Sequence, residues 1–389
     1  MFKNIKLKRA IKKCISPVLS RINEILPKDD NTILLYSANG GIEHNLIPIK
    51  RYLLENDYDT KYKIYCGVEN INLCDNDSDR VKYINRAQSV LIFLFCKHVY
   101  YTTGQIPVKP SRNQIVIHLD HGTATIKANN LMSNINNGDD FFFTYYTVPG
   151  DVYIPIAMKE FNCNKSNVVI NGEPVNDDLL NRRVTYNLGN YSKIGLWAPT
   201  FRQSDYLGYD DSEEGLLPAF DENDYEELNE NLKTHNFMLI VKLHPCQNVD
   251  NKEILHFSNL NIYSHKEFVE HGYDLYSLLS QVDFLLGDYS SVSLQYLLLD
   301  RPQAFVIPDI DEYKQKRGFA FDDPLEYMPG VKVFNKNDLY NFFDELDSNV
   351  DRFAEERKRV KNIIYKYQDS NNCKRALELG NITYNKSKV

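Results

Sequence analysis

Hydrophobic residues recur along most of the chain in short, nearly continuous runs separated by stretches with helical periodicity. The runs rich in Val, Ile and aromatic residues are predicted to be strands: Ile33–Tyr36, Lys63–Cys66, Ile115–Leu119, Val168–Ile170, Ile194–Ala198, Phe237–Leu243, Val282–Leu286 and Ala304–Ile307. Runs that do not alternate with polar residues are typical of strands buried on both faces of a sheet. Strands that alternate with helices form parallel sheets with right-handed crossovers. The pattern therefore predicts an α/β fold.

These runs fall into two series, which predicts two domains of ordinary size for a chain of 389 residues. The polar stretch from Asn181 to Ser192 separates the two series, so we place an N-terminal domain at residues 29–188 and a C-terminal domain at residues 189–389. Both are predicted to be Rossmann-like and doubly wound. The acidic segment 203–223 is predicted to be an exposed loop, and the charged run 350–379 to be helical.

The first 28 residues differ from the rest of the chain in charge and periodicity. Eight Lys or Arg and one Glu give them a charge of +7, whereas the whole chain carries −8 and the remainder therefore carries −15. Their apolar residues recur at three- and four-residue steps, which predicts an amphipathic helix: Ile11, Ile15, Val18, Leu19, Ile22, Ile25 and Leu26. Such a helix either lies on an anionic membrane surface or packs on its own domain. The sequence leaves both alternatives open.

Composition and charge narrow the class of protein further. The acidic body of the chain argues against nucleic acid as a partner. The seven cysteines are odd in number and include no closely spaced pair, which fits reduced thiols rather than a disulfide framework. The longest apolar run, Val90–Cys96, is far shorter than the ~20 residues that span a bilayer. We expect it to be a buried strand.

Candidate chemistry follows the predicted strands, because ligands of open α/β sheets bind beyond the carboxyl ends of the strands. Five strand ends carry small, hydroxyl-bearing or basic residues: Ser37-Ala38-Asn39-Gly40-Gly41, Asp120-His121-Gly122-Thr123, Pro199-Thr200-Phe201-Arg202, His244-Pro245 and Gly287-Asp288-Tyr289-Ser290-Ser291. Groups of this kind bind phosphate: a Ser-Ser pair at a helix start offers hydroxyls and backbone N–H groups, and Arg202 offers a planar fork. Each group also has a structural interpretation, as a helix cap, a satisfied histidine or a surface arginine.

Other catalytic motifs are missing from the sequence. It contains no Gly-x-x-x-x-Gly-Lys-Ser/Thr loop and no Gly-x-Ser-x-Gly turn. Asp309-Ile310-Asp311 follows a predicted strand and precedes a helical run, so we interpret its acids as capping residues of a loop rather than as metal ligands.

The order of the motifs along residues 115–375 resembles the CDP-glycerol glycerophosphotransferase family, which includes teichoic-acid primases and polymerases and related capsule enzymes. The matching segments are His121-Gly122-Thr123 with Lys127, Gly172 to Asp177, Ala198 to Arg202, Lys242 to Pro245, Asp288 to Val292, Arg301-Pro302, Tyr313, Arg317 to Phe319, Phe321-Asp322, Pro329-Gly330, and Asp369 with Arg375. The chain departs from the family pattern at Ala124, Val175 and Gln295.

The resemblance implies a two-domain B-type glycosyltransferase architecture, with the donor nucleotide in the C-terminal half and the acceptor in the cleft. It implies that His121 and His244 are catalytic. It assigns donor binding to Thr200, Arg202, Lys242, Asp288, Ser290, Ser291 and Arg317. It assigns the acceptor side or cleft to Gly122, Thr123, Lys127, Asn176 and Asp177. The small-residue turn after the first predicted strand adds Gly40 and Gly41 to this group, because it lets a ligand approach the backbone.

The activity that the resemblance implies is transfer of glycerol phosphate or ribitol phosphate from CDP-glycerol or CDP-ribitol to a lipid-linked or polymeric acceptor, with release of CMP. No cofactor is required, and loosely bound Mg²⁺ stays an open alternative. The expected location is the cytoplasmic face of the cell membrane, as a peripheral protein. Two other functions stay open: a glycosyltransferase that uses a nucleotide sugar, and a non-catalytic paralogue that binds donor or polymer.

Overall fold

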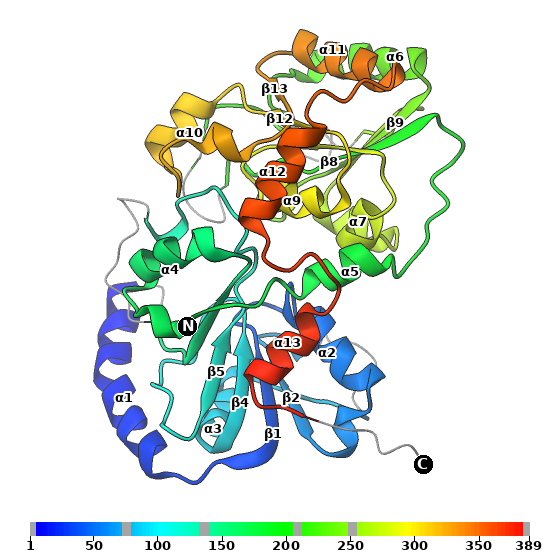
Figure 1. Ribbon diagram of the computed structural model, residues 1–389. Coiled ribbons are helices and arrows are strands. Elements are labelled where there is room, and N and C mark those ends of the chain that lie inside the picture. The colour runs from blue at the N-terminus through cyan, green and yellow to red at the C-terminus, as the bar shows by residue number, and fades with distance from the viewer. Residues whose placement is uncertain are drawn as a thin grey trace. The chain divides into compact units, whose positions relative to one another are not determined.

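The computed structural model describes residues 5–71, 79–131, 141–204, 210, 212–247 and 255–383 (Figure 1). The chain divides into two compact units. The first unit comprises residues 1–123, 137–177 and 369–389, and the second comprises residues 124–136 and 178–368. Each unit is built around one parallel sheet, so the predicted pair of α/β domains is confirmed.

The division differs from the predicted boundary at residues 188 and 189 because two segments join the unit that is distant in sequence. Residues 124–136 belong to the second unit, where Lys127 forms an antiparallel bridge with Phe319. Residues 369–389 belong to the first unit, whose core contains Cys373 and Leu377. The hydrophobic pattern marks which faces are buried but not the core that receives them, and so it predicts contiguous domains.

The first sheet has seven strands in the order β3-β2-β1-β4-β5-β6-β7, and all neighbouring strands are parallel. The strands are β1 (Asp29–Tyr36), β2 (Lys63–Gly67), β3 (Lys82–Ile84), β4 (Cys96–Tyr101), β5 (Ile115–His118), β6 (Tyr145–Val148) and β7 (Val168–Ile170). The helices of this part of the chain are α1 (Ile5–Ile25), α2 (Leu46–Glu55), α3 (Arg86–Phe95), α4 (Ile154–Phe161), α5 (Val175–Asn181), which crosses into the second unit, and α13 (Asn372–Leu379).

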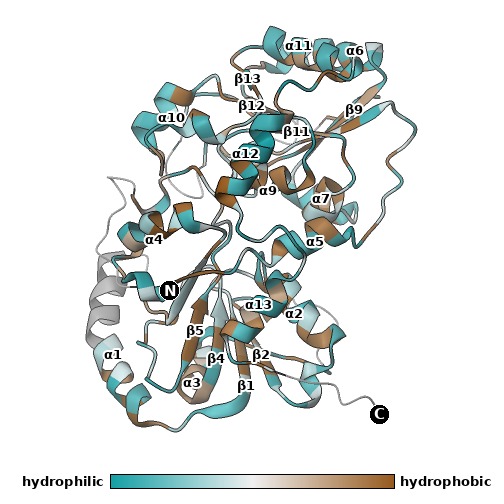
Figure 2. Ribbon diagram, viewed as in Figure 1, coloured by the Kyte–Doolittle hydropathy of each residue, from teal (hydrophilic) through white to brown (hydrophobic). Residues whose placement is uncertain are grey.

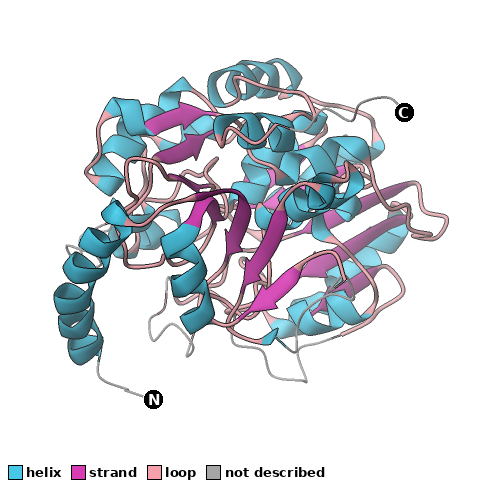
Figure 3. Cartoon of the chain, turned by 90° about the horizontal axis from the view of Figure 1, so that it is seen from below, coloured by secondary structure: helices cyan, strands magenta, loops and turns pink. Residues whose placement is uncertain are grey.

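Successive residues of β1 show how this sheet is buried on both faces. Ile33 and Leu35 belong to a core that also contains residues of α2 and α13. Leu34 and Tyr36 belong to the core on the opposite face, together with residues of α3. The strands are accordingly apolar over most of their length in Figure 2, and helices cover both faces in Figure 3.

The second sheet has six parallel strands in the order β10-β9-β8-β11-β12-β13. They are β8 (Lys193–Trp197), β9 (Phe237–Lys242), β10 (Leu260–Tyr263), β11 (Phe284–Gly287), β12 (Gln303–Val306) and β13 (Val331–Val333). The helices are α6 (Tyr225–Thr234), α7 (His265–Glu270), α8 (Leu275–Leu279), α9 (Ser291–Gln295), α10 (Ile310–Lys316), α11 (Lys336–Asp347) and α12 (Ala354–Ile364). The closing run predicted to be helical is thus divided between α12 and α13.

All of the strands predicted in the two series are present, but the prediction for Val90–Cys96 is wrong. Most of that run lies in α3, which begins with a reciprocal cap between Asn85 and Gln88. A continuous apolar run does not distinguish a buried strand from a buried helix, and here the cap decides. The strands β3, β4, β6, β10 and β13 were not predicted; four of them have only three or four residues, which is too short to show a clear periodicity.

The N-terminal segment is helical, as predicted, and α1 runs through Pro17 without interruption. Among the described residues, no helix is both long enough and apolar enough to cross a membrane.

Candidate active site

The carboxyl edge of the first sheet carries one group of candidate residues. Ligands bind doubly wound sheets where the strand order changes direction, which here is between β1 and β4. The turn after β1 contains Gly40 and Gly41. The carbonyl of Gly40 accepts a hydrogen bond from the backbone N–H of Asn70 (3.0 Å). The turn after β4 approaches it closely, since a Cβ at Gly104, where φ is +64°, would lie 2.3 Å from the Cβ of Ala38. Only glycine permits both the angle and the approach.

His121 follows β5, and the preceding aspartate orients its imidazole. Asp120 Oδ1 lies 2.6 Å from His121 Nδ1, and Asp120 Oδ2 accepts a hydrogen bond from the Tyr146 hydroxyl (2.8 Å). Because a carboxylate only accepts hydrogen bonds, Nδ1 carries the hydrogen and Nε2 of the neutral ring is the basic nitrogen. The His121 side chain is 59% exposed. This arrangement suits a general base.

The Asp120 carboxylate stays ionised although it is largely buried. Burial alone would raise the pKa of Asp120, but the charge of His121 and the hydrogen bonds from it outweigh burial and hold the pKa well below its usual value. Burial lowers the pKa of His118 behind it, which keeps that second ring neutral. The negative charge of Asp120 is therefore directed at His121.

A residue distant in sequence holds the His-Gly-Thr turn. The Glu173 carboxylate, which is buried, accepts hydrogen bonds from the backbone N–H (2.6 Å) and the hydroxyl (3.2 Å) of Thr123. Gly122, with φ of +141°, makes the turn between His121 and Thr123. Gly122 and Thr123 thus support His121 rather than extend toward solvent. Glu173 was not among the predicted site residues, and its place within the Gly172–Asp177 segment is the one local signal that points to it.

Asn176 and Asp177 lie where the start of α5 meets the start of α13. The Asp177 carboxylate accepts hydrogen bonds from the backbone N–H and the side-chain amide of Asn372 (2.9 and 2.8 Å) and from the Cys373 N–H (2.8 Å). Both predicted residues are buried. The hydrogen bonds of Asp177 attach the start of α13 to the start of α5.

Lys127 lies in the second unit, although the sequence groups it with His121. Its neighbours pair with the segment after α10: the Ala128 N–H donates to Gly318 O (3.1 Å) and the Ala320 N–H to Ile126 O (2.8 Å). Arg317, another predicted donor-binding residue, precedes this segment and is half-buried. The His-Gly-Thr-to-Lys element is therefore divided between the two units.

In the second unit the strand order changes direction between β8 and β11, and a buried ionic network lies at their carboxyl ends. The Thr200 N–H and hydroxyl both donate to the Asp288 carboxylate (2.7 Å each). Arg202 donates from Nη1 to Asp288 and from Nε to Asp309 (2.7 Å each). The Tyr289 hydroxyl donates to Asp309 (2.8 Å). This network joins the turns after β8, β11 and β12.

Arg202 is committed to these carboxylates and is fully buried. Burial lowers the pKa of the Arg202 guanidinium, but Asp288 and Asp309 outweigh burial and raise it. Burial raises the pKa of Asp309, while the Arg202 charge and hydrogen bonds from Ser212, Arg202 and Tyr289 outweigh it and lower the pKa. Each guanidinium nitrogen of Arg202 thus donates to a protein acceptor, and the direct contact with the donor that the sequence suggested stays a prediction.

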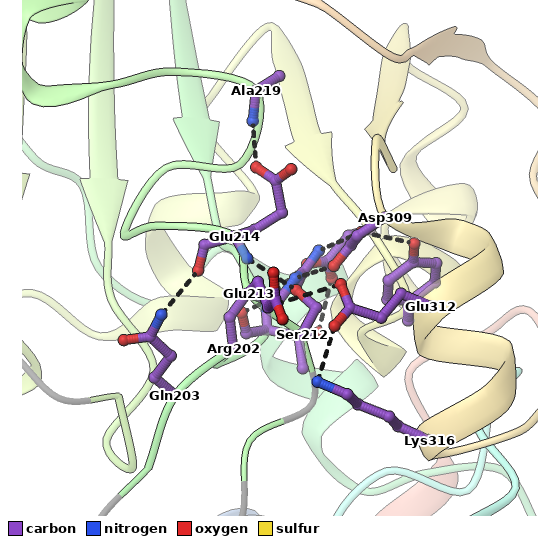
Figure 4. A network of polar contacts seen from close by, with 12 residues as sticks. Arg202, Gln203, Ser212, Glu213, Glu214, Ala219, Asp309, Glu312 and Lys316 are labelled. Carbon is purple, nitrogen blue, oxygen red and sulfur yellow. Dashed lines mark hydrogen bonds and ion pairs between the residues drawn. The ribbon is translucent and has the colours of Figure 1, made fainter.

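The acidic segment 203–223 extends this network (Figure 4). The Glu213 N–H donates to the Glu312 carboxylate (3.2 Å), which also pairs with Lys316 (2.7 Å). Leu217 and Phe220 are buried in the core of the second unit. The prediction of an exposed loop is therefore wrong for residues 216–218 and Phe220, which are buried, whereas Glu213, Gly215 and residues 221–223 are exposed as predicted.

The hydroxyls of Ser290 and Ser291 have different environments. Ser290 Oγ accepts a hydrogen bond from the Val292 N–H (3.4 Å) and caps α9, and the Ser290 N–H donates to Asp288 (3.1 Å). Ser291 is half-buried, and its hydroxyl makes no hydrogen bond within the described part of the chain. The capping interpretation thus holds for Ser290, while Ser291 is available to a ligand.

His244 follows β9 and has the opposite tautomer to His121. Its Nδ1 accepts a hydrogen bond from the Cys246 N–H (3.1 Å), so in the neutral ring Nε2 carries the hydrogen. The ring lies against Phe201, with centroids 5.2 Å apart. A half-buried Nε2–H is a donor suited to a phosphate oxygen or to protonation of a leaving group.

Lys242, the last residue of β9, is a cation that no described carboxylate neutralises. Its Nζ donates to Leu243 O (3.3 Å) and lies 5.7 Å from the centre of the Phe268 ring. Burial lowers the pKa of Lys242 to about 8. Burial and the Lys242 charge lower the pKa of His265 at the start of α7. A half-buried cation of this kind favours an anionic ligand. Across the described residues, no group of three or more His, Cys, Asp or Glu could hold a metal ion.

Comparison with known protein families gives a match over most of the chain. The model of the family described as CDP-glycerol:poly(glycerophosphate) glycerophosphotransferase matches residues 18–379. The teichoic acid poly(glycerol phosphate) polymerase of Bacillus spizizenii is 25% identical over 87% of this chain and 92% of its own length. The teichoic acid ribitol-phosphate polymerase TarL of Staphylococcus aureus is 26% identical over 90% of this chain and 62% of its own length. The teichoic acid glycerol-phosphate primase of Bacillus subtilis is 29% identical over 51% of this chain and 48% of its own.

Solved structures resemble the chain over nearly its whole length. The wall teichoic acid polymerase TagF, in a variant soaked with CDPG, gives a TM-score of 0.70 at 20% identity and covers 98% of each chain. A putative UDP-N-acetylglucosamine 2-epimerase from Listeria monocytogenes gives a TM-score of 0.52 at 11% identity, over 90% of this chain and 95% of its own. The B-type glycosyltransferase fold that the sequence implied is thereby confirmed. At these identities the structural likeness concerns the fold alone.

Proposed function

The chain belongs to the CDP-glycerol:poly(glycerophosphate) glycerophosphotransferase family, and from this premise we propose that it transfers a polyol phosphate from a CDP-linked donor to a surface polymer. The donor is CDP-glycerol or CDP-ribitol, and the acceptor is a hydroxyl of a teichoic acid, a capsule or a related polymer. The acceptor oxygen forms a bond to the phosphorus that bears the polyol. The bond from that phosphorus to the bridging oxygen of the diphosphate breaks, and CMP leaves with the bonding electrons.

The observation that carries this proposal is the pair of complementary histidine tautomers. Nε2 is the basic nitrogen of His121 because Asp120 holds its Nδ1–H, so His121 accepts the proton of the acceptor hydroxyl. His244 carries its hydrogen on Nε2 because the backbone N–H of Cys246 donates to its Nδ1, so it donates to the diphosphate or to the departing CMP. The fold thus prepares one ring to take a proton and the other to donate a hydrogen bond.

The remaining donor contacts come from the carboxyl edge of the second sheet. Lys242 supplies a positive charge without a carboxylate partner among the described residues, and Ser291 supplies a hydroxyl. Thr200, Arg202 and Asp288 hold the turns that carry these groups. Phosphoryl transfer requires little covalent chemistry from a protein, so positioning and stabilisation of developing charge account for most of the catalysis.

The first prediction concerns the donor. CDP-glycerol or CDP-ribitol should bind at least about tenfold more tightly than UDP-glucose in calorimetric titrations, because the phosphate-binding turns match a family that is named for a CDP-linked donor. The matched assay is release of CMP in the presence of an acceptor. Preference for the UDP sugar would favour a glycosyltransferase, and tight CDP-polyol binding without CMP release would favour a non-catalytic paralogue.

Two departures from the family pattern do not argue for such a paralogue, because they lie in packing positions. Val175 is buried, and its N–H donates to the Asn45 side chain (3.1 Å). Gln295 is fully buried and accepts a hydrogen bond from the Tyr276 hydroxyl (3.2 Å). Neither side chain extends to the surface of the carboxyl edges.

We also propose that the protein binds the cytoplasmic face of the membrane through α1. The helix is docked on the first unit by one face: the Asn23 amide donates to Lys109 O (2.8 Å) and Gln114 Oε1 (2.9 Å), and Leu19 and Leu26 pack on the core. Most of the predicted stripe lies on another face and stays exposed: Ile15 (49%), Val18 (58%), Ile22 (39%) and Ile25 (81%). Ile11 lies outside the residues whose side chains are described.

Exposed apolar side chains on α3 add to this surface. Leu91 is 60% exposed and Phe95 is 48% exposed, and α3 contacts α1. A docked helix with an uncovered apolar stripe and a charge of +7 in its segment is suited to an anionic membrane surface, where each Lys or Arg contributes about 1 kcal/mol.

The second prediction tests this surface. The full chain should co-sediment with anionic liposomes, sediment much less with neutral ones, and dissociate at high ionic strength, which screens the attraction. The triple substitution Val18→Ser, Ile22→Ser and Ile25→Ser should lower partitioning at least about tenfold, because each exposed aliphatic side chain loses up to about 2 kcal/mol of burial in the acyl boundary.

The matched control is the pair Val269→Ser and Val350→Ser, which removes exposed apolar side chains from the second unit. These variants should bind liposomes like the unmodified chain. Equal binding by the triple variant would contradict the proposal. Deletion of α1 is a poorer test, because Leu19, Asn23 and Leu26 belong to the folded unit.

A further inference from the structure

A second histidine lies beside the proposed base in the first unit. The rings of His44 and His121 have centroids 5.6 Å apart and are tilted by 53°. His44 immediately precedes the cap of α2, after the turn that contains Gly40 and Gly41, and its side chain is exposed. The carboxyl edge of the first sheet therefore presents two imidazoles, one of which the proposed reaction does not use.

The backbone holds His44 in a conformation that residues with a Cβ rarely adopt. Its φ is +47°, in the left-handed region. Both neighbours are fixed by side-chain hydrogen bonds. Glu43 accepts from Ser37 Oγ, Asn39 Nδ2 and Thr103 Oγ1, at 3.2, 2.5 and 2.5 Å. Asn45 donates to Leu119 O and Asp120 O and accepts from the Val175 N–H, at 3.1, 3.0 and 3.1 Å. The two fixed neighbours therefore determine where the backbone of His44 lies relative to the turn after β1.

The carboxylates near the two rings already accept hydrogen bonds from other groups. Glu43 accepts from two hydroxyls and an amide, and Asp120 accepts from His121 and Tyr146. Behind them, burial lowers the pKa of His118 and keeps that ring uncharged. Burial likewise raises the pKa of Tyr146, so its hydroxyl keeps its proton. Because the Nδ1–H of His121 is held by Asp120, the imidazole at this edge that can donate a hydrogen bond to an anion is the exposed ring of His44.

We propose that His44 binds the phosphate of the acceptor's terminal polyol phosphate and so places its free hydroxyl on His121. This inference rests on the proposed function and adds a specificity-determining residue to it. In an extended glycerol phosphate the free terminal hydroxyl and the phosphorus are about 6 Å apart, from single bonds of about 1.5 Å. The separation of the two rings, 5.6 Å, matches this spacing. His44 thereby selects an acceptor that ends in a three-carbon polyol phosphate over one that lacks phosphate.

A kinetic comparison of two acceptors tests the inference. With the donor on which the unmodified chain releases CMP, His44→Asn should raise KM for glycerol phosphate about tenfold or more, the effect expected from losing one charge-assisted hydrogen bond. The KM for glycerol and kcat with either acceptor should change less than about threefold. Asparagine is the chosen replacement because it tolerates positive φ. His44→Lys, which restores an N–H donor, should recover most of the loss.

The matched control is His271→Asn, which removes an exposed histidine of the second unit and should change neither KM. A similar loss with both acceptors, or no loss with either, would overturn the proposal. A further measurement does not depend on turnover: in titrations of the full chain with sn-glycerol 3-phosphate, the ring resonances of His44 should shift, and His44→Asn should weaken binding about tenfold. If the unmodified chain binds glycerol phosphate through His44 but releases no CMP, the proposed function fails and this inference stands. If CMP is released and the ring does not shift, the inference alone fails.

Discussion

Replacing His121 by alanine should lower kcat by about 10²–10⁴ and leave donor affinity nearly unchanged, because the ring that accepts the hydroxyl proton is lost. Asp120 lies 2.6 Å from Nδ1 of His121 and so selects the tautomer in which Nε2 is basic. Alanine has no group that replaces this basic nitrogen. Donor affinity is measured by titration with the CDP-polyol, and kcat by CMP release at saturating acceptor. Single-turnover measurements separate loss of chemistry from slow product release.

Asp120→Asn and His244→Ala are compared with His121→Ala to separate the role of the base from that of the donor-side histidine. Asp120→Asn keeps the imidazole but replaces the carboxylate with a neutral amide whose NH2 can donate to Nδ1 and favour the other tautomer, so it should lower kcat by about 10–10⁴ without changing donor affinity. His244→Ala should weaken donor binding and also lower kcat, because its Nε2–H serves the donor side. Small and equal effects of His121→Ala and His244→Ala would mean that both histidines are structural.

The largest effect on stability is expected at Arg202. Arg202→Met should lower the free energy of unfolding by about 3–5 kcal/mol, because it leaves the Asp288 and Asp309 carboxylates buried without their cation. The measurement is equilibrium urea denaturation, with an unchanged dependence on denaturant as the sign that the unfolded state is the same. Loss of donor binding should follow as a consequence, since Thr200 and the Ser-Ser turn depend on Asp288.

Two further variants separate the ionic network from a direct role in donor binding. The combination of Arg202→Met with Asp288→Asn and Asp309→Asn removes the uncompensated charges and should recover part of the stability. Arg352→Ala removes an exposed partner of Glu345 and should cost less than about 1 kcal/mol. An Arg202→Met variant of normal stability that cannot bind the donor would contradict the positioning role and restore the phosphate contact that the sequence suggested.

The fold could be predicted from the sequence to the extent that burial leaves a local pattern. Val168–Ile170 was predicted with the bounds of β7, and the other long apolar runs became strands of the two sheets. Val90–Cys96 became a helix because apolar continuity carries no period, and the cap at Asn85 lies outside the run. The exchange of residues 124–136 and 369–389 between the units left no local pattern at all.

The sequence by itself determined which residue types follow each strand, and hence that His121, His244 and the Ser290-Ser291 turn lie at carboxyl edges of parallel sheets. The tertiary structure alone decided what those side chains do. Hydrogen bonds from partners far along the chain select the orientation of a turn: Glu173 holds Thr123 from fifty residues away, and Asp309 joins Arg202 to the turn after β12. Periodicity likewise predicted the apolar stripe of α1, but only packing decided that the face with Asn23 is docked and the face with Ile25 is exposed. A local pattern records the chemistry of side chains, whereas burial and hydrogen-bond partners are properties of the assembled core.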